Sequence, residues 1–183
     1  MASHPPRRSD FNYIGRYEYF LTFCTYRRLP HFRDERIVSL VAAQLLQCSR
    51  TFEIAIHAYA AMPDHVHVVA QGLTDAADLF AFMREFKQQT GWQFRRDHHG
   101  KLWQGSFYDH VRRQEENFGE MIEYVVNNPV NAGLASTPED YPFWDSFTQT
   151  REGLLAYLRG EGPWKSPLLE IPVIGINGQP IKG

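Results

Sequence analysis

The feature that most constrains the fold is a pair of β-rich runs separated by only two residues. The first run is "FEIAIHAYAAM" (residues 52–62), and the second, "HVHVVAQG" (residues 65–72), follows directly after "PD". So short a connection predicts an antiparallel hairpin. Side chains alternate between the two faces of a strand, so His65 and His67 point to one face and Val66 to the other. The two histidines are then either half of a divalent-metal site or the polar face of an ordinary strand.

The runs around this hairpin predict an α+β protein. The expected elements are a strand over 17–26, a helix over 34–50, a helix over 75–96, a strand over 102–113 and a helix over 116–133 that Pro129 must end or kink. With the hairpin, the order is β-α-β-β-α-β followed by one more helix. That order is the ferredoxin-like arrangement, a four-stranded antiparallel sheet with two helices on one face.

Length and composition favour one globular domain in a reducing compartment. The chain has 183 residues, of which 43% are hydrophobic, enough for a buried core. No apolar run reaches the roughly 20 residues that a membrane helix needs. Two cysteines, Cys24 and Cys48, are too few for a disulfide framework. We therefore expect a cytoplasmic protein with no membrane partner.

Charge is distributed unevenly along the chain. The net charge is −2, yet the stretch from Ala81 to Arg113 holds seven Arg or Lys against three acidic residues. Such a stretch is either a solvated face or a surface that contacts phosphates. The candidate phosphate contacts are Arg84, Lys87, Arg95, Arg96, Arg112 and Arg113.

The last expected helix carries two further candidates for a site. Tyr124 and Asn128 are four residues apart, so they project from one helical face. A tyrosine hydroxyl is a possible nucleophile, and an amide oxygen is an acceptable ligand for Mg²⁺ or Mn²⁺ beside imidazoles. His65, His67 and Asn128 would then form a three-ligand site with positions open for a phosphate oxygen.

Three motifs together resemble a known family. "MPDHVHVV", then "WQGSFYDHVRR", then "IEYVVNNPVNAGL" is similar to the REP-associated tyrosine transposases, which belong to the HUH single-strand nucleases. The resemblance spans roughly Tyr17 to Phe147. It implies that His65, His67 and Asn128 bind the metal and that Tyr124 is the nucleophile.

The resemblance also implies a reaction and a partner. The tyrosine would attack a phosphodiester of single-stranded DNA, forming a 5′-phosphotyrosine and freeing a 3′-hydroxyl, so no nucleotide cofactor is needed. The substrate would be a hairpin formed by a repetitive extragenic palindrome (REP), the protein a bacterial-type cytoplasmic monomer, and the basic residues above DNA contacts. The expected organisation is an N-terminal arm (1–16), an HUH transposase catalytic domain (17–150) and a C-terminal helix with an extended tail (151–183).

Two other functions are compatible with parts of this pattern. A ferredoxin-like sheet can bind single-stranded nucleic acid without catalysis, by stacking bases on its aromatic residues. A metal-dependent phosphodiesterase could instead use water as the nucleophile, with Tyr124 only positioning the substrate. Tyr108 is a rival candidate for the nucleophile, since it lies in the last expected strand.

Overall fold

The hairpin predicted around Pro63 and Asp64 forms the centre of the sheet. The structure is a computed structural model that describes residues 13–105, 108–112 and 117–163. Strand β2 (Ile54–Met62) and strand β3 (His65–Gly72) pair antiparallel, with Met62 opposite His65. The prediction of a tight hairpin with both histidines at the start of its second strand is confirmed.

The sheet has five antiparallel strands in the order β4-β1-β3-β2-β5. Its other members are β1 (Glu18–Cys24), β4 (Tyr108–Val111) and β5 (Trp144–Asp145). The predicted class, α+β with an antiparallel sheet, is confirmed, but the predicted number of four strands is wrong. Strand β5 has only two residues and pairs with the outer edge of β2, so it leaves no alternating pattern in the sequence.

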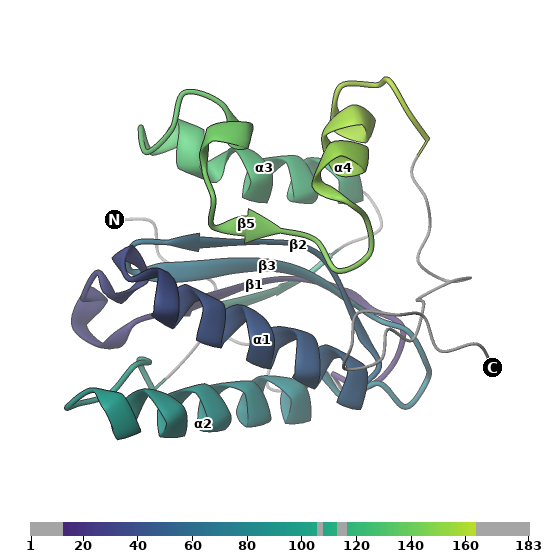
Figure 1. Cartoon of the computed structure of the whole chain (residues 1–183). Coiled ribbons are helices and arrows are strands. Elements are labelled where there is room, and N and C mark those ends of the chain that lie inside the picture. Colours follow the sequence, from purple (N-terminus) through teal and green to yellow (C-terminus); the bar gives the residue numbers. More distant parts are fainter. Residues whose placement is uncertain (1–12, 106–107, 113–116, 164–183) are drawn as a thin grey trace, which may run out of the picture.

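Helices cover both faces of the sheet (Figure 1). Helices α1 (Glu35–Thr51) and α2 (Leu79–Asp97) lie on one face, while α3 (Phe118–Asn131) and α4 (Arg151–Leu158) lie on the other. Aspartates begin both helices of the first pair: Asp34 accepts a hydrogen bond from the amide of Arg36, and Asp78 accepts one from the amide of Ala81. None of the described helices combines the length and apolar character needed to span a membrane.

Helix α3 packs closely on the sheet because the strand beneath it has small side chains. Its buried residues are Ile122, Val125, Val126 and Pro129. Ile122, Val125 and Val126 share a hydrophobic cluster with Val69 of β3 and with Ala58 and Ala60 of β2, and both alanines are fully buried. The helix continues two residues beyond Pro129, whereas the sequence suggested that proline would end or kink it there. Backbone carbonyls near the end of α3 accept hydrogen bonds. The carbonyl of Asn128 accepts from the amide of Ala132, and that of Pro129 accepts from the amide of Leu134.

A β-bulge in β2 places a histidine beneath the start of α3. The register between β2 and β3 shifts between Ile56 and Ala58, so His57 is the extra residue at the bulge. The His57 ring is fully buried and packs against the ring of Phe118. Its Nε2 lies 3.0 Å from Oε1 of Gln71, and its Nδ1 lies 3.4 Å from the Thr148 hydroxyl. None of these partners is charged, and burial lowers the pKa of His57 from 6.5 to about 4.

Because His57 is buried and its pKa is lowered, we expect the free energy of unfolding to fall in mild acid. The folded-state pKa is below the unfolded value, so the unfolded chain binds an extra proton between pH 6.5 and about 4. The contribution of His57 is fully present above pH 6.5 and decreases as the pH falls to 4, by on the order of 3 kcal/mol. Denaturant unfolding at several pH values should show this decrease, and His57→Gln should flatten it. Equal pH dependence in the two proteins would contradict the prediction.

Candidate active site beneath helix α3

The candidate site lies on the sheet face that α3 covers. Strands β1 and β3 pair with Thr22 opposite His67 and Cys24 opposite His65. Directly opposed residues project to the same face, so Thr22 and, two residues earlier, Phe20 share a face with the two histidines. Val69, two residues beyond His67, packs in the cluster that includes α3. Pairing of the two strands therefore brings the histidines beneath the helix that carries Tyr124.

The two imidazoles converge through their Nε2 atoms. Nε2 of His65 lies 3.0 Å from Nε2 of His67, and the two rings are nearly perpendicular. The second ring nitrogen of each histidine, Nδ1, contacts a residue outside the pair. Nδ1 of His65 lies 2.6 Å from Oδ1 of Asp64, and Nδ1 of His67 lies 2.9 Å from the Thr22 hydroxyl. A carboxylate can only accept, so Nδ1 of His65 is the protonated nitrogen and its Nε2 carries the lone pair.

Both histidines are neutral at physiological pH. Burial lowers the pKa of His65 and outweighs the opposite effect of the Asp64 carboxylate. Burial also lowers the pKa of His67 to about 3, helped by the proximity of His65 and Arg28. Imidazoles must be neutral to bind a metal, so the pair has the required protonation state.

Tyr124 lies directly beside this pair. Its ring centroid is 5.7 Å from that of His67 and 5.6 Å from that of Phe20, with edge-to-face geometry in both contacts. Phe20 in turn contacts His67 at 5.2 Å, so the three rings form one cluster. The neighbouring Val125 and Val126 are buried against the sheet, whereas Tyr124 is 49% exposed. Tyr124 is therefore supported by the cluster while part of it remains accessible to a substrate.

Asn128 occupies the predicted position on α3, one turn beyond Tyr124, and is partly buried. Its amide side chain makes no hydrogen bond to any residue that the structure describes, so it could serve a ligand from outside the chain. Across the described ranges, no group of three or more His, Cys, Asp or Glu side chains could hold a metal ion. A metal at the histidine pair would need other ligands, such as an amide, water or a phosphate.

The described basic residues of the central stretch lie mainly on α2. Arg84, Arg95 and Arg96 are exposed on α2, on the side of the sheet opposite to α3 (Figure 1). The Lys87 ammonium donates to the carbonyl of Gln104 at 2.7 Å, and Arg112 forms an ion pair with Glu18. Arg113 lies outside the described residues, as do the side chain of Tyr108 and the tail beyond residue 163. Of the five candidate phosphate contacts that the structure describes, four lie on α2, and the fifth, Arg112, directly follows β4.

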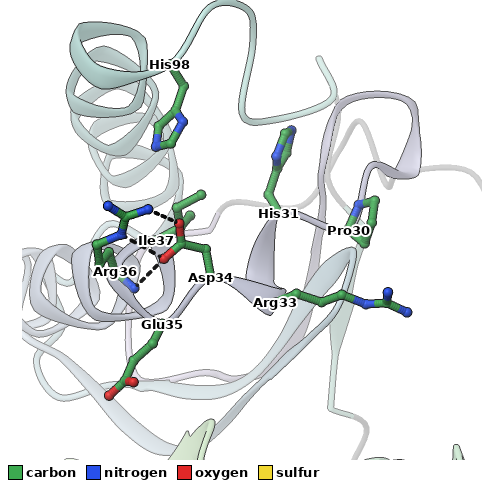
Figure 2. A pocket seen from close by; sticks show the side chains of 8 residues that line it. All are labelled: Pro30, His31, Arg33, Asp34, Glu35, Arg36, Ile37 and His98. Atoms are coloured by element: carbon green, nitrogen blue, oxygen red, sulfur yellow. Dashed lines mark hydrogen bonds and ion pairs between the residues drawn. The ribbon is translucent and has the colours of Figure 1, made fainter.

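A shallow hollow lies at the start of α1 (Figure 2). It is lined by Pro30, His31, Arg33, Asp34, Glu35, Arg36, Ile37 and His98. Within it, the Asp34 carboxylate accepts from the guanidinium and the amide of Arg36, and these hydrogen bonds lower the pKa of Asp34 to about 2. None of the lining residues belongs to the histidine–tyrosine cluster.

Several residues of the site were not found by sequence reasoning. Asp64 could have been found, because a carboxylate directly before a His-x-His pair can orient the first imidazole. Thr22 and Phe20 left no such signal, because their position depends on the register between two strands about 45 residues apart.

Comparison with known proteins agrees with the resemblance of the motifs. The model of the family described as "Transposase IS200 like" matches residues 14–128, more than half of the chain. A REP-associated tyrosine transposase of Escherichia coli K12 is 24% identical over 114 residues, which cover 60% of this chain and 65% of the relative. A provisionally named REP-associated tyrosine transposase of Haemophilus influenzae is 24% identical over 149 residues, covering 74% of this chain and 82% of the relative.

A solved structure of a REP-associated tyrosine transposase bound to a REP hairpin has the same fold. It superimposes with a TM-score of 0.64 and 20% identity, and the match covers 100% of both chains. The family match extends from the start of the described chain through β1, the histidine pair and α3 as far as Asn128. On this match, the chain belongs to the family of IS200-like transposases.

Proposed function

We propose that this protein is a metal-dependent tyrosine transposase that cleaves and rejoins single-stranded DNA at REP-type hairpins, with Tyr124 as its nucleophile. The observation that carries the proposal is the placement of a half-exposed tyrosine ring 5.7 Å from the ring of His67, whose Nε2 converges with that of His65. The relatives named above support the hairpin substrate. A tyrosine used only for packing would not need to lie half-exposed beside an imidazole of a converging histidine pair.

The histidine pair fits a divalent cation. Their Nε2 atoms lie 3.0 Å apart and face one another, and neutral imidazole nitrogens are ligands that divalent transition metals accept. His65 and His67 would hold Mg²⁺ or Mn²⁺ through Nε2, and the amide oxygen of Asn128 would be the third protein ligand. Such a metal would polarise the scissile phosphate and offset the charge that develops on it. Because Mg²⁺ prefers oxygen ligands, Mn²⁺ is the better probe of a site with two imidazoles.

The residues of the chain would then perform a reversible transfer. The Tyr124 oxygen attacks phosphorus and gives up its proton, the bond between phosphorus and O3′ breaks, and O3′ takes up a proton. The 5′-phosphate remains on Tyr124 as a phosphodiester. Attack by a 3′-hydroxyl on this linkage reverses the step and regenerates the tyrosine, so the bond energy is conserved without a nucleotide cofactor. Contacts of Phe20 with both rings hold Tyr124 in position beside His67.

We also propose the organisation that goes with this function. Strands β1 to β4 with α1 and α2 form a ferredoxin-like unit, and α3 adds the nucleophile on the opposite face. Residues 17–150 would form the catalytic domain, preceded by an arm (1–16) and followed by a C-terminal helix and tail (151–183). The protein would act as a monomer on single-stranded or hairpin DNA in the bacterial cytoplasm.

An adduct assay tests the proposal. The protein is incubated with Mn²⁺ and a REP-type hairpin oligonucleotide labelled at its 3′ end, and the products are separated under denaturing conditions. We expect the 3′ label to remain on the protein, because the 5′-phosphate of that fragment is joined to the tyrosine. Cleavage without an adduct would indicate a phosphodiesterase that uses water, and binding without cleavage a non-catalytic module. Either result would overturn the proposal.

Asn128→Ala is expected to weaken Mn²⁺ binding at least about tenfold, because it removes one of three proposed protein ligands. Isothermal titration calorimetry of the protein with Mn²⁺ measures this directly. Asn127→Ala is the matched control, since it removes the same amide group from the preceding position of α3, which faces a different direction. Equal affinities in the two variants would exclude Asn128 from the metal site.

A further inference from the structure

The turn between β1 and α1 has an unusual backbone. Arg27 and Arg28 have φ values of 55° and 57°, so two consecutive residues occupy the left-handed region. This region is unfavourable for residues with a Cβ atom, and glycine would occupy it without strain. Such a conformation persists only where surrounding contacts impose it, and it is concentrated at functional sites.

The contacts that impose the turn come from the β2–β3 connection. Thr25 is fully buried; its hydroxyl lies 2.7 Å from the carbonyl oxygen of Leu29 and 2.9 Å from that of Asp64. The amide of Thr25 also donates to the Asp64 carbonyl, and the amide of Phe32 donates to that of Pro63. The turn is thus attached to the two residues that precede His65.

The side chain of Arg28 points from this turn to Asp64. Its Nε donates to Oδ2 of Asp64 at 2.8 Å, and its Nη1 lies 2.8 Å from the sulfur of Cys24. The other carboxylate oxygen, Oδ1, accepts from Nδ1 of His65. Guanidinium, carboxylate and imidazole therefore form a continuous chain that ends at Nε2 of His65, where that atom faces His67.

The stability gained from the ion pair between Arg28 and Asp64 is too small to explain why the strained turn is kept. About half of the Arg28 side chain and a quarter of the Asp64 side chain are exposed. Ion pairs exposed to this degree contribute little to the free energy of folding, less than two residues in the left-handed region cost. The arrangement is better explained by what it does to the orientation of His65.

We propose that Arg28 is a positioning residue for His65 and acts through Asp64; this proposal rests on the metal site proposed above. Asp64 fixes the tautomer of His65, because its carboxylate must receive the Nδ1 proton. Arg28 fixes the carboxylate, because it holds the oxygen that His65 does not use. Without the guanidinium, the Asp64 side chain is free to rotate toward solvent, and His65 loses the partner that orients its ring.

Two glycine variants separate positioning from stability. Arg28→Gly and Arg27→Gly each relieve one left-handed residue, so both should melt at or above the temperature of the unmodified protein. Only Arg28→Gly removes the guanidinium that pairs with Asp64. We expect it to weaken Mn²⁺ binding in calorimetry by about 10- to 100-fold, whereas Arg27→Gly should bind Mn²⁺ like the unmodified protein. Hairpin affinity without metal should be the same in both variants.

A double-variant cycle tests whether the effect passes through Asp64. Asp64→Ala should weaken Mn²⁺ binding by a similar factor, and adding Arg28→Gly to it should cause no further loss. The role of Arg28 would be overturned if the losses of Mn²⁺ affinity in the two single variants multiply in the double variant. It would also be overturned if Arg28→Gly leaves Mn²⁺ affinity unchanged, or if it weakens only hairpin binding. If the unmodified protein binds no Mn²⁺, the metal site itself is wrong and the positioning role falls with it. If the unmodified protein binds Mn²⁺ and Arg28→Gly binds it equally well, only the positioning role is overturned.

Discussion

Replacing Tyr124 with phenylalanine is expected to eliminate the covalent protein–DNA adduct and to slow hairpin cleavage by at least about a thousandfold. The change removes one oxygen and keeps the ring, so the contacts with Phe20 and His67 should persist. Hairpin binding and the melting temperature should therefore change little. The adduct assay with a 3′-labelled hairpin measures the chemical step, and a gel-shift titration measures binding.

Two matched variants make this result specific. Tyr17→Phe removes a hydroxyl from another partly exposed tyrosine and should leave adduct formation intact. Tyr108→Phe tests the rival nucleophile on β4, whose backbone lies opposite Thr22. An adduct that survives in Tyr124→Phe and disappears in Tyr108→Phe would move the nucleophile from α3 to β4.

Removal of either histidine should have an effect of similar size on cleavage. In His65→Ala or His67→Ala only one imidazole remains, so we expect Mn²⁺ binding to become undetectable and cleavage to fall by at least about a thousandfold. Most of the hairpin affinity should remain, because contacts with phosphates and bases, and not the metal, supply the binding energy. Chelation of the metal in the unmodified protein should likewise reduce cleavage while most of the hairpin affinity remains.

The control for the histidine variants is His99→Ala, which removes an exposed imidazole after the end of α2. It should retain cleavage and Mn²⁺ binding. If His65→Ala and His67→Ala lose hairpin binding to the same extent as cleavage while remaining folded, the histidines contact DNA directly and the metal assignment is wrong.

What could be predicted from the sequence was local. The hairpin required only two adjacent β-rich runs, and the shared helical face of Tyr124 and Asn128 required only a spacing of four. The contact between Thr22 and His67 depends on the pairing of β1 with β3, and nothing within either strand specifies which residues will be opposite. Likewise, the fifth strand depends on tertiary pairing, since its two residues have no pattern of their own.

The distribution of charge along the chain does not show which basic residues form ion pairs. Arg84 and Arg112 belong to the same basic stretch, yet one is exposed on α2 and the other is paired with Glu18 of β1. Arg28, which pairs with Asp64, lies outside that stretch in the short turn between β1 and α1. The conformation that directs it inward is a backbone property, and arginine is not a residue type that signals a left-handed turn.

The two alanines beneath α3 have a consequence for how such a site can change. Ala58 and Ala60 set how near the helix approaches β2, and the same helix carries both Tyr124 and Asn128. A bulkier side chain at either alanine would push α3 away from β2, and Tyr124 and Asn128 would move together with the helix. The spacing between α3 and the sheet thus depends on the methyl groups of two buried alanines. Natural variation at these apolar positions could adjust the rate of strand transfer while every polar residue of the site stays the same.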